Sequence, residues 1–253
     1  MTEDINPQFG ELTEQDYTSR INTPAKSREY FETFHKPLVD EAKAASEDGK
    51  ARVVDIACGP AHELDFLKDD PDVVLYGVDL SIGQLIEGSR ERLRGVHLVA
   101  GDVTNFPFKE GFADVGIALN AMIYKPAEML KALKHSLRPG GKGAVNFRNF
   151  SNPNNQAFYD FYLRQGGQIY DEELVVRIGE REEKFNLKVV DYRNCADEKI
   201  RSLDRQVYFT SEEDIERLIR FVGLEISSHS KFSFASPANP NNEINVYTLR
   251  KAT

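Results

Sequence analysis

The sequence has no tryptophan and only two cysteines, Cys58 and Cys195. Two cysteines are too few for a disulfide framework, and no Cys or His pair has a metal-ligand spacing such as CxxC or HxxxH, so no metal site is expected. No run approaches the roughly 18 apolar residues of a membrane span. The opening MTEDINPQFG has neither the basic nor the apolar region of a secretory signal. We therefore expect a cytoplasmic protein that does not enter a membrane.

Basic residues are also in short supply. The chain has 32 Lys and Arg against 41 Asp and Glu, a net charge of −9. Binding to nucleic acid depends chiefly on Lys and Arg that neutralise phosphates, so neither a nucleic-acid partner nor an anionic membrane surface is expected. With 40% hydrophobic residues among 253, the chain can bury the core of one large domain, or of a domain with a lid.

Short apolar runs alternate with amphipathic stretches between residues 52 and 150, a pattern typical of parallel βαβ units. Apolar residues recur at helical intervals in 81–93 and 126–137, which predicts two helices. The turn residues Arg138-Pro139-Gly140-Gly141 are expected to precede the fifth strand. The pattern predicts an α/β fold with a doubly wound sheet whose strands cover 52–57, 73–79, 96–101, 113–119 and 142–148.

The flanking segments predict three further units around the core at 49–150. Residues 1–48 form an N-terminal helical arm or lid, whose helix over 24–48 is interrupted near Pro37. Residues 151–210 form an inserted β-rich cap with charged strands at 172–181, 184–195 and 199–210. Residues 211–253 add a helix with a capping box at its start and Gly223 at its end, then two strands separated by a turn at 236–243.

The segment VVDIACGPAHEL, residues 53–64, indicates a ligand loop after the first strand. Small residues at Ala57, Gly59 and Ala61 let a ligand approach the backbone at the carboxyl end of the sheet. Pro60 has no N–H to offer a phosphate, and the carboxylate of Asp55 would repel one. The same carboxylate suits a ligand that carries an ammonium group and no phosphate.

Two further acids end the next two strands. Asp79 follows Asp55 by 24 residues, close to the interval at which an acid accepts ribose hydroxyls in nucleoside-binding α/β folds. Asp102 is then placed to accept a hydrogen bond from the amine of an adenine. Acids at strand ends also cap helices, but three in order beside a small-residue loop predict a site for an adenosine that bears an amine.

These residues resemble the class I S-adenosylmethionine-dependent methyltransferases over about residues 50–150. The matching segments are VVDIACGPA, GVDLS, GDVTNFPF and LKHSLRPGGKGAVNF. The resemblance implies a mostly parallel seven-stranded sheet and S-adenosylmethionine as the cofactor. By position, it implies that Asp55, Ala57, Gly59 and Ala61 line the methionine moiety, that Asp79 holds the ribose and Leu80 packs on the adenine, that Asp102 and Val103 meet the adenine edge, and that Asn120 lies near the sulfonium. The sequence departs from the family at Ala57 and Ala61, which replace glycines.

Four residues are candidates for the acceptor side. Tyr124 and His35 are candidate catalytic groups, and Arg148 and Asn149, at the end of the fifth strand, are candidate anchors for a substrate. Cys58 is expected to be a small buried residue of the loop without chemistry of its own.

We expect methyl transfer to a nitrogen or oxygen of a small molecule by in-line displacement, with acceptor selection by the arm and the cap. Two alternatives stay open: a methyltransferase that acts on protein or RNA, and a protein that binds S-adenosylmethionine without methylating. An exposed β-rich cap also offers strand edges for a homodimer.

Overall fold

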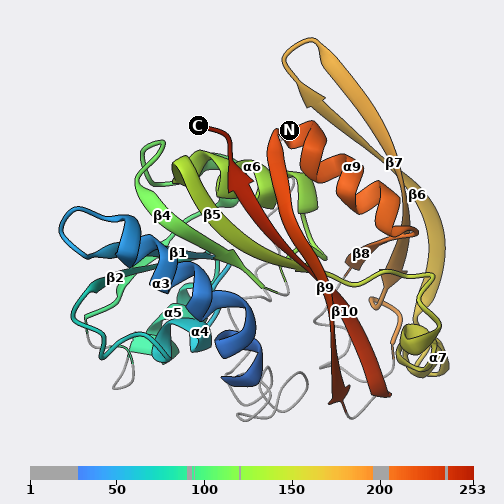
Figure 1. Cartoon of the computed structure of the whole chain (residues 1–253). Helices are drawn as coiled ribbons and strands as arrows, with labels where there is room; N and C mark the ends of the chain where they lie inside the picture. Colours follow the sequence, from blue (N-terminus) through green and yellow to red (C-terminus); the bar gives the residue numbers. More distant parts are fainter. Residues whose placement is uncertain (1–27, 90–92, 94, 120, 196–204, 237–238) are drawn as a thin grey trace.

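A seven-stranded sheet forms the centre of the computed structural model, which describes residues 28–89, 93, 95–119, 121–195, 205–236 and 239–253 (Figure 1). The strand order is β3-β2-β1-β4-β5-β10-β9. The first five strands pair in parallel, and β10 is antiparallel to both β5 and β9. The predicted α/β sheet is confirmed, with strands β1 Ala51–Ile56, β2 Val73–Asp79, β3 His97–Ala100, β4 Ala113–Ala118, β5 Leu137–Phe147, β9 Leu224–Ser236 and β10 Asn239–Lys251.

Helices cover both faces of this sheet because successive strand residues point to opposite sides. Val53 packs in a core with residues of α3 (Lys36–Ala45), α4 (His62–Asp65) and α5 (Ile82–Ser89). Its neighbour Val54 packs in a second core with residues of α6 (Pro126–Ser136) and α9 (Glu212–Val222). The fold is therefore doubly wound, as the alternating sequence pattern predicts.

The N-terminal helical segment is interrupted where the sequence predicts. A π-helical turn, η2 (Phe31–His35), leads into α3 with Pro37 near its start. Proline has no N–H and cannot continue the hydrogen-bond ladder of a preceding α-helix, which accounts for the irregular turn just before it. Residues 1–27, the rest of the expected arm, lie outside the described residues.

Two boundaries differ from the sequence prediction. Strand β5 begins at Leu137 rather than 142, because Ala113 already pairs with Leu137 and the register shifts before Val115 pairs with Lys142. The expected turn over 236–243 is shorter, since β9 continues to Ser236 and pairs there with Asn239 of β10. A strand is predicted from apolar residues that alternate with polar ones, and the stretch SPANPNNE is too polar to show that pattern.

The cap is an antiparallel sheet of three strands, β6 (Gln168–Ile178), β7 (Arg181–Asp191) and β8 (Arg205–Phe209). It is preceded by the short η4 (Pro153–Asn155) and by α7 (Gln156–Arg164). The first two strands were expected a few residues later, at 172–181 and 184–195. The third was expected at 199–210, a range that contains β8 and also overlaps residues outside the described ranges.

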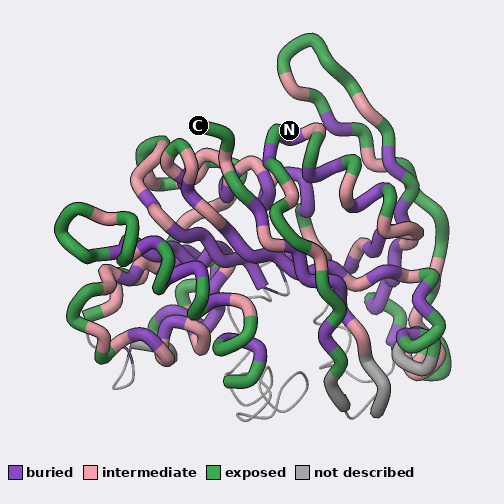
Figure 2. The backbone as a smooth tube through the Cα atoms, viewed as in Figure 1, coloured by how far each residue is buried: buried purple, intermediate pink, exposed green. Residues whose placement is uncertain are grey.

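The cap packs against α9 and shares its core. Val176 and Phe185 of the cap are buried in the same cluster as Leu218 of α9. The tip of the β6–β7 hairpin extends beyond the body of the molecule and is largely exposed, whereas buried residues follow the central strands (Figures 1 and 2). Among the described residues, no helix is long and apolar enough to span a bilayer.

Candidate cofactor and acceptor site

The loop after β1 has the backbone shape of a glycine turn although two of its residues are alanine. Ala57, Gly59 and Ala61 have φ angles of 57°, 53° and 55°, all in the left-handed region. This conformation costs a residue with a Cβ about 1–2 kcal/mol. A Cβ at Gly59 would also lie 2.6 Å from Gln84 Oε1. The loop thus keeps the conformation that brings its backbone close to a ligand, at some cost in strain.

Asp79, the last residue of β2, holds this loop in place through a hydrogen bond. Its Oδ2 accepts a hydrogen bond from the Gly59 N–H at 2.7 Å, and its Oδ1 accepts one from the Ser81 N–H at 2.8 Å. Burial raises the pKa of Asp79, while these backbone donors lower it. Each carboxylate oxygen has a further lone pair. Asp79 can therefore shape the loop and still accept a ribose hydroxyl.

Asp55, in β1, is an almost fully buried acid whose Oδ2 has no hydrogen-bond partner among the described residues. Burial raises its pKa well above the usual range, and the negative charges of Glu63 and Asp79 raise it further. A buried carboxylate of this kind is unfavourable unless a cation or a donor reaches it. Its position at the ligand loop fits an ammonium group.

The residues predicted to face an adenine are Asp102, Val103 and Leu80. Asp102 Oδ1 caps the short 3₁₀ helix η3 (Val103–Asn105) by accepting from the Thr104 N–H at 2.9 Å. Leu80 is 42% exposed and Ile82 60% exposed. Large apolar side chains so exposed beside a carboxylate suit the face of a planar base. The apolar Ile82, which follows the acidic motif, was not anticipated from the sequence.

Strand β8 of the cap crosses the carboxyl ends of β4 and β5. The Val207 N–H donates to the Ile123 carbonyl after β4 at 2.7 Å, and the Phe150 N–H after β5 donates to the Phe209 carbonyl at 2.8 Å. Asn149 forms a parallel bridge with Phe209. These contacts bring cap residues beside the predicted acceptor side.

Gln206 of β8 forms hydrogen bonds with three tyrosine hydroxyls at the predicted acceptor side. Its Nε2 donates to Tyr124 Oη at 3.2 Å, and its Oε1 accepts from Tyr208 at 2.6 Å and from Tyr192 at 3.1 Å. Burial raises the pKa of Tyr208, while the positive charge of Arg148 lowers it. Burial raises the pKa of Tyr124, and the charges of Tyr208 and Asp79 raise it further. Tyr124 therefore acts as a neutral hydroxyl rather than as a base.

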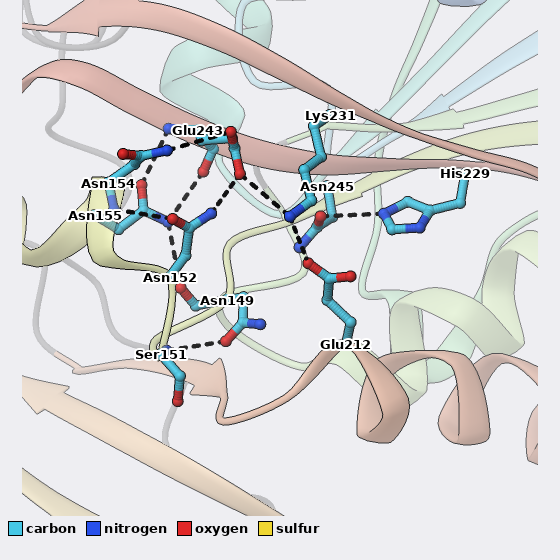
Figure 3. A network of polar contacts seen from close by, with 10 residues as sticks. All are labelled: Asn149, Ser151, Asn152, Asn154, Asn155, Glu212, His229, Lys231, Glu243 and Asn245. Carbon is cyan, nitrogen blue, oxygen red and sulfur yellow. Dashed lines mark hydrogen bonds and ion pairs between the residues drawn. The ribbon is translucent and has the colours of Figure 1, made fainter.

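Asn149 belongs to a different cluster. Its Oδ1 accepts from the Ser151 N–H at 2.9 Å, and its carbonyl accepts from Asn155 Nδ2 at 3.2 Å. Asn155 also pairs with the Glu243 backbone, donating to its carbonyl at 3.0 Å and accepting from its N–H at 3.1 Å. Figure 3 shows this cluster, which joins the start of the cap to α9, β9 and β10 through Asn149, Ser151, Asn152, Asn154, Asn155, Glu212, His229, Lys231, Glu243 and Asn245. Asn149 thus holds the cap in place, and a contact between Asn149 and a substrate stays a prediction.

His35 is fully buried and lies against aromatic rings. Its ring centroid is 5.2 Å from that of Tyr30 and 5.9 Å from that of Phe31. Neither ring nitrogen has a hydrogen-bond partner among the described residues, and burial lowers the pKa of His35 to about 3. This placement gives no support to the predicted catalytic role. Asn120, the other candidate near the sulfonium, lies outside the described residues.

Residues 53–141, which include the ligand loop and all three acidic strand ends, match the model of the methyltransferase domain family. This segment is a methyltransferase domain. The cofactor of such domains is S-adenosylmethionine, and the predicted Asp55, Asp79 and Asp102 all fall within the match. The sheet of the methyltransferase domain continues into β10 and β9, so the described seven-stranded sheet has the class I methyltransferase fold.

Relatives of the methyltransferase domain include two curated proteins. The chain is 37% identical over 118 residues to the demethylmenaquinone methyltransferase of Beutenbergia cavernae, a stretch that covers 45% of this chain and 48% of that protein. It is 34% identical over 113 residues to the trans-aconitate 2-methyltransferase of Methylobacterium nodulans, covering 44% and 43%. The chain thus spans about half the length of the curated relatives it matches.

A solved structure extends the likeness beyond the methyltransferase domain. A SAM-dependent methyltransferase from Methanosarcina mazei superposes with a TM-score of 0.56 at 13% identity, covering 80% of this chain and 93% of that one. The similarity in structure therefore includes much of the chain outside residues 53–141.

Proposed function

We propose that this protein transfers a methyl group from S-adenosylmethionine to a small-molecule acceptor. The observation that carries the proposal is the loop Ala57–Ala61, held by Asp79 in a glycine-type conformation beside buried Asp55, whose Oδ2 has no hydrogen-bond partner among the described residues. A buried acid oxygen that can accept from an ammonium group, a small-residue loop and a Pro60 without an N–H for a phosphate together suit an aminoacyl nucleoside.

The residues present fit this cofactor. Asp55 would hold the ammonium of the methionine moiety, Asp79 the ribose, and Asp102 with Leu80 the adenine. Bound S-adenosylmethionine would supply a methyl group on a sulfonium, and the neutral thioether that remains after transfer is a good leaving group. The protein then has to orient the acceptor in line and exclude water, for which effective molarities of order 10⁵ M or more are available without a catalytic side chain.

The acceptor side is formed by the ends of β4 and β5 together with the cap. Tyr124 and Arg148, which follow these two strands, are both half-buried. Two named relatives act on small molecules, a demethylmenaquinone and trans-aconitate. The net charge of −9 opposes an RNA acceptor. These points favour a small molecule with a nitrogen or oxygen nucleophile.

Calorimetric titration with S-adenosylmethionine, with NADH and ATP as controls, tests the proposal. We expect S-adenosylmethionine to bind with micromolar affinity and the two phosphate-bearing nucleotides not to bind. Asp79→Ala should weaken this binding by about 1–3 kcal/mol, or roughly 5- to 150-fold. The exposed Asp69→Ala serves as the matched control. Binding of NADH or ATP in place of S-adenosylmethionine would overturn the proposal.

A further inference from the structure

Strand β6 is the outer strand of the cap. The cap sheet has the order β6-β7-β8, so among the described residues β6 is paired on one side only. It pairs with β7 along its whole length, from Gln168 to Ile178, without a bulge. Figure 1 shows β6 on the outer side of the cap, where the hairpin projects from the body of the molecule. Such an edge carries a row of backbone N–H and C=O groups that can pair with a further strand.

This edge lacks the features that usually protect an outer strand. Proteins shield such edges with a short strand, a proline, a lysine or a bulge. β6 is 11 residues long, and its sequence QIYDEELVVRI contains neither proline nor lysine. Tyr170 and Val175 are each 38% exposed, which is unusual for large apolar side chains. The edge is therefore suited to pairing with another strand.

The hairpin turn determines which backbone groups face the open edge. Ile178 pairs with Arg181, so Gly179 and Glu180 form a two-residue loop. Gly179 has a φ of 59°, as the first loop residue of a type II′ turn requires. The residues that flank such a loop bond to each other, and backbone groups then alternate between the two sides of the strand. The groups that face the open edge belong to Asp171, Glu173, Val175 and Arg177.

The same four residues limit how a second β6 can pair here. In an antiparallel ladder, residues that face the partner strand stand opposite residues that do the same. Setting Glu173 opposite itself, or Asp171 opposite Glu173, brings like charges together, and this destabilises a sheet. Two registers instead bring Arg177 opposite an acid. One is centred on Leu174 and sets Arg177 opposite Asp171, and the other is centred on Val175 and sets Arg177 opposite Glu173.

The register centred on Leu174 pairs more of the strand. It extends from Tyr170 to Ile178, whereas the register centred on Val175 reaches only from Glu172 to Ile178. It also places Tyr170 opposite Ile178 of the other copy, a combination of aromatic and β-branched residues that stabilises sheets.

Both charged side chains of this register are accessible. Asp171 pairs with Lys188 of its own chain and Arg177 with Glu182, yet their side chains are 78% and 73% exposed. Each carboxylate and each guanidinium can form further hydrogen bonds. The two-fold symmetry of a dimer repeats the contact between Asp171 and Arg177, so opposite charges meet twice.

We propose that two copies of this chain associate through their β6 edges, antiparallel and with Leu174 opposite its counterpart, so that the two caps form one continuous sheet. The partner that fits this surface is thus a second copy of the chain. The inference does not depend on the methyltransferase function.

Sedimentation velocity of the full chain, at concentrations from about 5 to about 500 μM, tests the association. We expect a reversible equilibrium between monomer and dimer with a dissociation constant of about 100 μM or lower. A chain that stays monomeric over the whole range would overturn the proposal.

Charge-swap variants test the register. Arg177→Asp and Asp171→Arg should each raise the dissociation constant about tenfold or more, because like charges then stand opposite each other. Combining Asp171→Arg with Arg177→Asp should restore it to within about threefold of the wild type. If only Glu173→Arg combined with Arg177→Asp restores dimerisation, the register centred on Leu174 is wrong.

A proline tests the edge itself. Val175→Pro removes an N–H that faces away from β7, so it should abolish the dimer and leave the hairpin paired. The matched control for charge is Arg220→Asp on α9, because Arg220 is 61% exposed and pairs with Glu216 of its own chain; its dissociation constant should equal that of the wild type. Circular dichroism confirms folding, and if Val175→Pro does not fold, the charge swaps decide. A folded Val175→Pro that dimerises like the wild type would show that another surface forms the dimer.

Discussion

Asp55→Asn should stabilise the ligand-free protein, and the gain should depend on pH. Asp55 is 2% exposed, and its Oδ2 has no partner among the described residues. Burial chiefly, and then Glu63 and Asp79, raise the pKa of this carboxyl. The folded state therefore binds the Asp55 proton more tightly than the unfolded state does. The stability that this proton gives is complete below the unfolded pKa of about 3.9 and is lost as the pH rises toward the folded pKa.

The expected magnitude follows from the cost of a buried charged acceptor without a donor, about 1–3 kcal/mol. Asparagine has nearly the same shape and no charge, so at pH 8 Asp55→Asn should raise the free energy of unfolding by about this amount. For a chain of this size, each kcal/mol raises Tm by about 2–4 °C. At pH 4.5 the gain should shrink, because much of the wild-type Asp55 is then protonated.

Urea and thermal unfolding of the ligand-free protein at pH 4.5 and pH 8 measure this effect, with the exposed Asp69→Asn as control. Saturating S-adenosylmethionine should then stabilise the wild type more than Asp55→Asn, because the ammonium loses its partner in the variant. A variant that is less stable than wild type at pH 8, or equally stabilised at both pH values, would refute the reasoning.

Two further predictions concern the loop and the start of the cap. Ala57→Gly should raise the free energy of unfolding by up to about 1 kcal/mol, because relief of the left-handed strain at φ 57° exceeds the added entropy of the unfolded chain. The control Ala118→Gly in β4, measured by the same urea titration, should instead lower the free energy of unfolding. If both variants are less stable than the wild type, the strain argument is contradicted. Asn155→Ala should cost about 2–3 kcal/mol, since one buried hydrogen bond to Asn149 and two part-buried ones to Glu243 are lost. Asn154→Ala, at an exposed neighbour, should cost under about 0.5 kcal/mol in the same thermal assay, and equal losses would show that Asn155 does not anchor the cap.

The cofactor side was accessible to sequence analysis because its residues follow a local rule. Parallel strands end at one edge of the sheet, so acids that follow successive apolar runs are brought together by topology alone. Asp55, Asp79 and Asp102 illustrate this, as does the small-residue loop. The fold class and a site for an amine-bearing adenosine could therefore be predicted without knowledge of any side-chain contact, and the family resemblance implied S-adenosylmethionine.

The acceptor side could not be predicted in the same way. Gln206 meets Tyr124 across 82 positions of sequence, and neither periodicity nor composition indicates such a pairing. Asn149 follows β5, and its Oδ1 accepts from the Ser151 N–H, a local contact that the sequence pattern does not indicate. His35 lies in a helix whose aromatic face could cover either a ligand or a core, and only packing distinguishes the two.

The position of β10 in the sheet leaves the edge of β5 unpaired during synthesis of the chain. This strand is the last in the described chain, yet it lies inside the sheet, between β5 and β9. During synthesis β5 emerges long before its neighbour, with the entire cap translated in between. The edge of β5 stays unpaired until β10 arrives, so a chain that ends before this strand would expose the edge of β5, which is buried inside the complete sheet, to aggregation.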